Sequence, residues 1–327
     1  MKKCSHRFYK LFTLAFLAFF IVTACQSKDY FPKLNVTVAN CRIIKHQLGE
    51  SCIPNEPQRI ILIDQDSLEA VVALGLKPIA ATRANALGGK AALFAGKIDD
   101  IVYLGKESQP NIEKMVQLRP DLILGYEIGA EYYNLFSQIA PTVSLELSQT
   151  EWKTSLKKIA EIVNRTQTAQ QILKQYHQRI EQLRKTIQNK QTNITVSISR
   201  FYSGSDITQF QTQQSFPGVV LEDVGLSIPP LQHKIAQTES SLDKSYVLVS
   251  KERLELLDGD VMFVALDPNA EDSFNKYRHT VLWKQLNVVK NNQVYTVDSG
   301  YWIFGNILAA NAILDDLSKY LLEGNRE

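Results

Sequence analysis

TQTAQQILKQYHQRIEQLRKTIQ, residues 166–188, is the stretch that decides how this chain folds. It contains no Gly and no Pro, and it is rich in residues that favour helices. Its apolar residues recur every three or four positions, as one stripe of a helix does. They are Ala169, Ile172, Leu173, Tyr176, Ile180, Leu183 and Ile187. At about 1.5 Å per residue such a helix spans roughly 30 Å, the width of a small domain. Strand-like and helix-like segments alternate on both sides of it, so it is either a hinge or a strut between two α/β halves.

The composition is that of a globular protein with about two domains. The chain has 327 residues, of which 45% are hydrophobic and 21% are charged. Its formal charge of +2 owes much to residues 1–24, which hold four bases and no acid. Without these residues, 32 of the 36 basic residues remain against 34 acidic residues, so the net charge is −2. A mature chain of this charge does not have the basic character of a nucleic-acid-binding protein.

Residues 1–24 are typical of an export signal. A basic start precedes an uncharged apolar run over residues 11–22, which is the length of a signal-peptide core and short for a membrane span. Small residues then lead into Cys25, in the pattern of a bacterial lipoprotein cleavage site. The prediction is a lipid on Cys25, with an ordinary signal peptide cut near Ala24 as the alternative. The polar residues 25–40 are predicted to be a tether from the lipid to the first domain.

Two of the four cysteines then remain for the folded protein. Cys41 and Cys52 bracket CRIIKHQLGESC, which has the pattern of a β-hairpin. In an oxidising compartment a disulfide here would stabilise the fold by roughly 2–3 kcal/mol. The alternative is a metal site with His46, which lacks a fourth ligand. The hairpin register stays open, because the midpoint between the cysteines is not the better turn at Leu48–Gly49.

The segments before and after the long helix have a similar plan. Residues 59–63 are predicted to be a buried strand, and Asp66 or Ser67 to cap the following helix, which Gly75 ends. This strand–helix–strand order is typical of a parallel sheet. The helix–turn–strand unit of residues 111–124 recurs in residues 250–263 with a constant offset. The correspondence indicates that both halves are built alike.

No enzyme motif stands out. The sequence contains no GxSxG, no HExxH, no P-loop and no GxGxxG after a strand. The histidines beyond the signal are scattered without ligand spacing. No catalytic residue, resident cofactor or protein-ligated metal is predicted.

Aromatic and arginine side chains gather where predicted strands end. In open α/β sheets ligands bind at those ends. Arginine suits anionic oxygen-rich ligands, and aromatic rings supply rigid apolar walls. The predicted ligand contacts are Arg83, Tyr126, Arg200, Tyr202, Trp302 and Phe304. For Trp302 the alternative is a place in the core, and for Arg83 a solvated loop.

An ordered set of motifs resembles a known family. The set is PQRIILIDQDSLEAVVALGLKPIAA, QPNIEKMVQLRPDLIL, IAPTV, the long helix, SFPGVVLEDVGL and VLWKQLNVVKNNQVYTVDSGYW. Together with the lipoprotein signal it resembles the iron–siderophore substrate-binding lipoproteins of bacterial ABC importers, relatives of the ferric citrate, ferrichrome and cobalamin binding proteins. The resemblance covers nearly the whole mature chain. The CRII…GESC hairpin further resembles cyanobacterial members.

The resemblance implies an α/β fold of two Rossmann-like lobes joined by one long helix, the helical-backbone periplasmic binding protein fold. It implies lobes over residues 41–150 and 191–327, joined by residues 151–190, and a ligand cleft between them. It also implies docking on the permease through Glu113 and Glu222, whose alternative is a pair of solvated helix acids. The hydroxamate-contacting arginine of ferrichrome binders has no clean equivalent, since Arg83 is shifted in the alignment, so the siderophore class stays open.

The expected function is therefore capture of a ferric siderophore by a monomeric, lipid-anchored envelope protein and its delivery to a permease. Cobalamin or haem binding is the alternative within the superfamily. A ligand sensor or a surface hydrolase is the alternative outside it. The lone connecting helix is predicted to be a strut, with small lobe closure.

Overall fold

The computed structural model describes residues 41–83, 91–94, 96–190, 194–239 and 243–323. The predicted signal peptide, the tether and Cys25 lie outside the described residues. Among the described residues, no helix is both long and apolar enough to cross a membrane.

A disulfide-linked hairpin begins the described chain. Strands β1 (Cys41–His46) and β2 (Gly49–Pro54) pair antiparallel, with His46 opposite Gly49. The turn is therefore Gln47–Leu48, and Gly49 with φ 138° starts the second arm. Cys41 and Cys52 form the disulfide, with Cα atoms 5.4 Å apart.

The first lobe is a mostly parallel six-stranded sheet. Its strands are β3 (Ile60–Leu62), β4 (Ala80–Arg83), β5 (Val102–Lys106), β6 (Gln109–Pro110), β7 (Leu122–Tyr126) and β8 (Thr142–Leu145). The order is β6-β5-β4-β3-β7-β8, and only the edge strand β6 runs antiparallel. The helices are α2 (Gln65–Ala73), α3 (Ala91–Phe94), α4 (Ile112–Leu118) and α5 (Ala130–Phe136).

The N-cap of α2 differs from the prediction. Asp64, rather than Asp66 or Ser67, has the extended cap conformation, and its side chain accepts the Ser67 N–H at 2.7 Å. Strand β3 ends at Leu62, so only Ile63 separates it from the cap at Asp64. This places a carboxyl group at the strand end, which is the ligand-facing edge of such a sheet.

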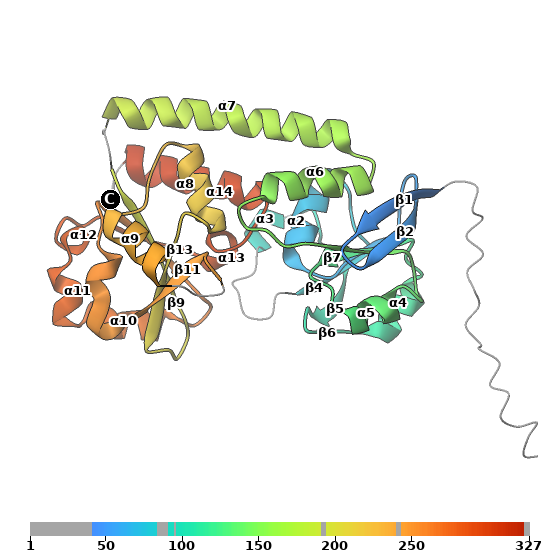
Figure 1. Cartoon of the computed structure of the whole chain (residues 1–327), viewed down its shortest axis with the longest axis horizontal. Coiled ribbons are helices and arrows are strands. Elements are labelled where there is room, and N and C mark those ends of the chain that lie inside the picture. The colour runs from blue at the N-terminus through green and yellow to red at the C-terminus, as the bar shows by residue number, and fades with distance from the viewer. Residues whose placement is uncertain (1–40, 84–90, 95, 191–193, 240–242, 324–327) are drawn as a thin grey trace, which may run out of the picture. The chain divides into compact units, whose positions relative to one another are not determined.

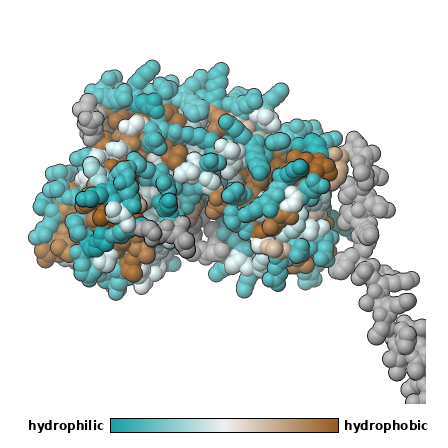
Figure 2. Space-filling view, in the orientation of Figure 1, coloured by the Kyte–Doolittle hydropathy of each residue, from teal (hydrophilic) through white to brown (hydrophobic). Residues whose placement is uncertain are grey.

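The predicted long helix is present as α7 (Thr166–Lys190), preceded by α6 (Trp152–Ile162). Six of the seven stripe residues are buried, namely Ala169, Leu173, Tyr176, Ile180, Leu183 and Ile187, and Ile172 is half-buried. Figure 1 shows α7 running above α6 at one end and above α8 and α14 at the other. Figure 2 shows hydrophilic residues along its outer edge and hydrophobic residues beneath.

The second lobe has a mixed five-stranded sheet. Its strands are β9 (Val196–Phe201), β10 (Ile207–Gln211), β11 (Tyr246–Ser250), β12 (Val261–Leu266) and β13 (Val294–Asp298), in the order β11-β10-β9-β12-β13. Strands β10 and β11 run antiparallel to their neighbours. The helices are α8 (Phe216–Asp223), α9 (Pro230–Thr238), the 3₁₀ helix η2 (Lys251–Leu257), α10 (Glu271–Arg278), α11 (Val281–Gln285), α12 (Asn287–Lys290), α13 (Ser299–Trp302), α14 (Ile307–Ser318) and the π-helix η3 (Lys319–Glu323).

The repeated sequence unit occupies equivalent places in both lobes. Helix α4 leads into β7 in the first lobe, as η2 leads into β12 in the second. Asp121 accepts the Gln58 and Arg59 N–H groups at 2.8 and 2.9 Å, at the start of β3. Asp260 accepts the Thr195 N–H at 2.7 Å, just before β9. Two carboxylates at equivalent positions of the repeated unit, Asp121 and Asp260, thus fix the start of the equivalent strand in each lobe.

One hydrophobic core extends across both lobes beneath α7. It joins Leu68 of α2 with Trp152 of α6 and Phe216 of α8. The Trp152 ring meets the Tyr176 ring edge-on with centroids 5.2 Å apart, and the Phe216 ring at 6.0 Å. The two sheets are therefore held on one side by shared packing and not by the connecting chain alone.

Candidate functional site

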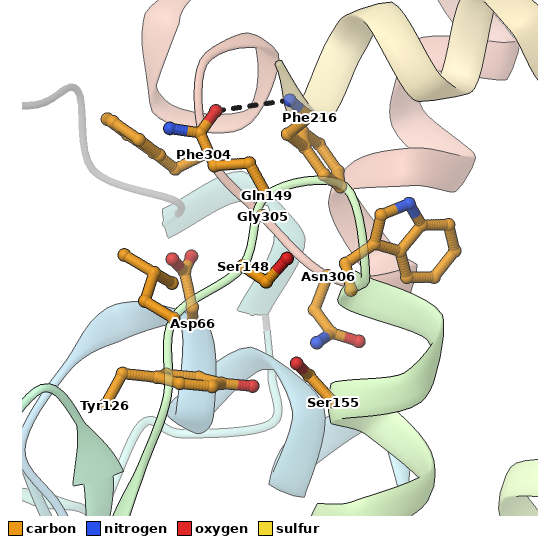
Figure 3. Close-up of a pocket in the computed structure, with 11 residues that line it drawn as sticks. Asp66, Tyr126, Ser148, Gln149, Ser155, Phe216, Phe304, Gly305 and Asn306 are labelled. Atoms are coloured by element: carbon orange, nitrogen blue, oxygen red, sulfur yellow. Dashed lines mark hydrogen bonds between the residues drawn. The ribbon is translucent and has the colours of Figure 1, made fainter. Parts of the chain in front are cut away.

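A cavity opens where the two lobes meet. Its enclosed volume is about 10 Å³, which is room for about one water molecule. Its lining comes from the first lobe, the segment between β8 and α6, and the second lobe, and consists of Asp66, Tyr126, Leu147, Ser148, Gln149, Trp152, Ser155, Phe216, Phe304, Gly305 and Asn306. Figure 3 shows Tyr126, Phe304 and Phe216 around Ser148, Ser155 and Asn306, so aromatic walls surround a few polar groups. Such a lining is typical of small-molecule sites.

Local hydrogen bonds fix this lining. Gln149 accepts the Phe216 N–H at 3.2 Å, the dashed line of Figure 3, and donates to Ser245 at 3.3 Å. It therefore ties the crossing segment to the second lobe. Tyr126 is hydrogen-bonded to Ser155 of α6, and burial raises the pKa of its phenol well above the usual value. The Tyr126 ring is thus a neutral wall held from two sides.

A second cavity in the first lobe shares Tyr126. Its volume is about 210 Å³, and its polar lining includes Asp64, Glu107, Glu127 and Tyr132. Burial raises the pKa of Asp64 to about 7, and the neighbouring charge of Asp66 adds to the effect. Asp64 also accepts the Tyr126 N–H at 2.8 Å. This carboxyl group therefore orders the junction of β3, α2 and β7.

Glycine is required at this junction. A Cβ atom on Gly125 would lie 2.4 Å from the Ile63 side chain and 2.8 Å from the Asp64 carboxyl. The close approach of β7 to the end of β3 therefore depends on the missing side chain.

Four of the six predicted ligand contacts, namely Arg83, Arg200, Tyr202 and Trp302, lie outside the lining of these two cavities. Arg83 ends β4 and is exposed, with its guanidinium carbon 4.0 Å from the centre of the Tyr103 ring. Arg200 lies inside β9 and forms a two-pronged ion pair with Asp267, at 3.0 and 2.9 Å. The Arg200 guanidinium carbon lies 4.7 Å from the centre of the Tyr202 ring, whose hydroxyl bonds Gln209. Arg200 is already charge-compensated within the second lobe.

Trp302 lies in the core, which is the alternative to its predicted role as a pocket wall. Its side chain is fully buried, and its ring stacks on Phe263 with centroids 4.5 Å apart. Its indole N–H donates to Asp316 at 2.8 Å. The short helix α13 turns Trp302 into the core, and the half-buried Phe304 lines the cavity instead. Of the six predicted contacts, Tyr126 and Phe304 are the two that come together.

The two predicted docking acids occupy unlike positions. Glu113 is exposed in the first turn of α4. Glu222 is exposed at the far end of α8, beside Asp223, which bonds Lys153 and Tyr176. The counterpart of Glu113 in the repeated unit is Glu252, exposed in the first turn of η2. No signal in the α8 sequence distinguishes Glu222 from a solvated acid.

Several lining residues have no predicted role. Ser148, Gln149, Ser155 and Asn306 are common polar residues whose convergence depends on tertiary structure. Asp64 could have been found, because a carboxylate that directly ends an apolar strand needs a reason. Within the described part of the chain, no group of three or more His, Cys, Asp or Glu residues is placed to hold a metal ion.

Comparison with known proteins gives a consistent family. The periplasmic binding protein family model matches residues 60–301. A "probable siderophore-binding lipoprotein" of Bacillus subtilis, YfiY, is 31% identical over 94% of this chain and 96% of its own. The Fe(3+)-citrate-binding protein YfmC of Bacillus subtilis is 26% identical over 98% of each chain. The structure of Staphylococcus aureus SirA complexed with staphyloferrin B has a TM-score of 0.73 at 25% identity, covering 85% of this chain and 97% of that one. The two-lobed fold is thereby confirmed.

Proposed function

The chain belongs to the periplasmic binding protein family, and we propose from that membership that it is the substrate-binding lipoprotein of an ABC importer for a ferric siderophore. The observation that carries the proposal is the cavity shared by both lobes, walled by Tyr126 and Phe304. Two relatives support it, because one is named as a probable siderophore-binding lipoprotein and the other as an Fe(3+)-citrate-binding protein. Iron wrapped by a siderophore needs no protein ligands of its own.

The proposed binding surface combines the two cavities with nearby charges. Tyr126 and Phe304 would pack against the ligand's organic backbone. Arg83 is the exposed guanidinium available to an anionic ferric complex, and Arg200 would require Asp267 to yield before it could serve.

Titration calorimetry of the full mature chain tests the proposal. The probes are ferric citrate, ferric staphyloferrin B and ferric desferrioxamine B, with cobalamin, haem and the iron-free siderophores as comparisons. We expect one ferric complex to bind, and Phe304→Ala to weaken it by about tenfold, which corresponds to about 1.4 kcal/mol. Binding of cobalamin or haem and of no ferric siderophore would assign the chain to a sister ligand class.

We propose that an exposed acid on each lobe docks the permease. Glu113 serves the first lobe. For the second, Glu222 follows from the family resemblance, whereas Glu252 is the structural counterpart of Glu113 and is favoured by the repeated unit. Single Ala variants of the three, tested for siderophore uptake with the permease in vesicles, separate the two. If uptake is lost in Glu113→Ala and Glu252→Ala but kept in Glu222→Ala, the docking acid of the second lobe is Glu252. If uptake is lost in Glu113→Ala and Glu222→Ala but kept in Glu252→Ala, the docking acid of the second lobe is Glu222.

We also propose a lipid anchor on Cys25 after removal of residues 1–24, a tether over residues 25–40, and the lobe limits 41–150 and 191–327 joined by residues 151–190. The protein would then be a monomer on the envelope side of a membrane. Cys25→Ser should release it into the soluble fraction, with ligand binding unchanged. Retention of that variant in the membrane fraction would remove the anchor proposal.

A further inference from the structure

A buried carboxyl of the first lobe holds the start of a helix in the second. Glu69 lies on α2 and its side chain is fully buried. Its Oε1 atom accepts the Asn306 N–H at 2.9 Å and the Ala309 N–H at 2.8 Å. Asn306 is the N-cap of α14, and Ala309 lies in its first turn. Acids are almost never fully buried unless their oxygens are paired, so these bonds are part of what allows Glu69 to sit there.

The contact resembles a capping box, except that the carboxyl group comes from the other lobe and not from the capped helix itself. The first backbone N–H groups of a helix have no partners inside the helix, and the positive end of the helix dipole favours a carboxyl group. Here the Asn306 side chain accepts the Ile307 N–H at 2.9 Å, and Glu69 accepts those of Asn306 and Ala309. The start of α14 is therefore complete only when the first lobe is in place.

This cap sits directly behind the ligand cavity. Phe304, Gly305 and Asn306 all line it, and Asn306 is the residue that Glu69 bonds. The corner is closely packed, and Gly305 is required there because a Cβ atom on it would lie 2.3 Å from the Ala309 Cβ. Whatever fixes Asn306 thus fixes the place of the Phe304 ring opposite Tyr126.

We propose that Glu69 is a positioning residue of the binding site, which sets the angle between the lobes and holds the Phe304–Asn306 corner for the ligand. The inference rests on the proposed function only in taking this cavity as the ligand site. Glu69 need not touch the ligand.

The test compares Glu69→Ala and Glu69→Gln with a matched control, Asp258→Ala. Asp258 accepts the Asn287 and Val288 N–H groups of α12 at 3.0 and 2.9 Å, so it caps a helix in the same way but within one lobe. Hydrogen exchange of the Asn306 and Ala309 amides in the ligand-free protein measures the cap itself. Calorimetry with the ferric complex that binds the wild type measures the site.

We expect Glu69→Ala to speed exchange of both amides by at least about tenfold and to weaken ligand binding by about tenfold. Gln keeps an oxygen acceptor, so Glu69→Gln should stay within about threefold of the wild type in both measurements. Asp258→Ala should lower stability and leave affinity unchanged. If Glu69→Ala does not fold, Glu69→Asp, which withdraws the carboxyl by one methylene, takes its place.

A folded Glu69→Ala variant with wild-type exchange at Asn306 and Ala309, or with unchanged ligand affinity, overturns the proposal. If the wild type binds no ferric complex, the proposed function fails, whereas the exchange measurement still decides whether Glu69 fixes the corner.

Discussion

Arg200 and Asp267 form an enclosed ion pair, with side chains 12% and 8% exposed. Removing one partner of such a pair leaves a charge poorly solvated. We expect Asp267→Ala to lower the free energy of unfolding by about 3 kcal/mol, measured by urea denaturation. The control is Asp100→Ala, whose pair with Lys77 is 83% and 55% exposed. That variant should leave the free energy of unfolding nearly unchanged, because solvent screens an exposed pair. Equal losses in the two variants would show that the pair is effectively solvated.

Trp302 and Phe304 are two residues apart, and their replacement by Ala should have different effects on stability and on ligand affinity. Trp302→Ala empties a core site stacked on Phe263 and should cost about 3–5 kcal/mol of stability. Phe304→Ala touches the cavity wall, and its main effect should be on ligand affinity. Chemical denaturation and calorimetry on both variants separate the two. If Trp302→Phe, which keeps an aromatic ring, abolishes binding without loss of stability, Trp302 belongs to the site after all.

These two residues also illustrate what a sequence can specify about a site. The strand ahead of them ends at Asp298, and both aromatics follow it, so the pattern correctly predicted aromatics near the sheet edge. Which ring lines the cavity depends on one turn of helix α13, which the hydrogen bond from Trp302 to Asp316 orients. That partner is distant in sequence and unmarked by any motif.

At the scale of elements, the amphipathic and buried apolar segments were predictable and the polar strands were not. Helix α7 and strands β3 and β12 follow from periodicity and apolar runs. Strand β10 (ITQFQ) is mostly polar, yet Gln209 and Gln211 in it are buried. Gln209 is accommodated by the Tyr202 hydroxyl, a tertiary contact. Local sequence cannot reveal that a glutamine will find such a partner.

The β1–β2 hairpin is an element whose docking should depend on pH. His46 accepts the Leu48 N–H on Nδ1, and Nε2 lies 3.1 Å from Ser51 Oγ, which donates to the Thr142 carbonyl. This arrangement requires neutral His46. Burial, followed by the charge of Lys158, lowers its pKa below the usual 6.5.

The sign of the pH effect follows from linkage. A lowered pKa means that the unfolded chain takes up a proton more readily than the folded one. Stability is therefore full above pH 6.5 and falls as the pH drops through 6.5 toward the folded pKa. We expect His46→Gln to flatten this part of the profile of unfolding free energy against pH, with the distant, exposed His233→Gln as control. An unchanged slope in His46→Gln would mean that another group carries the effect.

At the scale of the whole molecule, three features of the described residues are prominent among those that join the lobes. The helix α7 spans them, the core runs continuously beneath it through Trp152 and Phe216, and Glu69 bonds the start of α14. A connecting helix alone could bend at either end. A shared core resists such bending, because close-packed side chains do not slide without losing contacts.

We therefore expect the free protein already to hold the bound arrangement of its lobes. Solution scattering on the ligand-free and ligand-bound forms should differ little, with backbone shifts of about 1 Å or less. A Gln178→Pro variant interrupts α7 at an exposed position and should lower stability by about 3 kcal/mol. The lobes of this variant should nevertheless keep their arrangement, because the core and Glu69 remain. A large change of scattering when the wild type binds ligand would identify α7 as a hinge. A change in lobe arrangement seen only in the Gln178→Pro variant would mean that α7 alone holds the lobes apart.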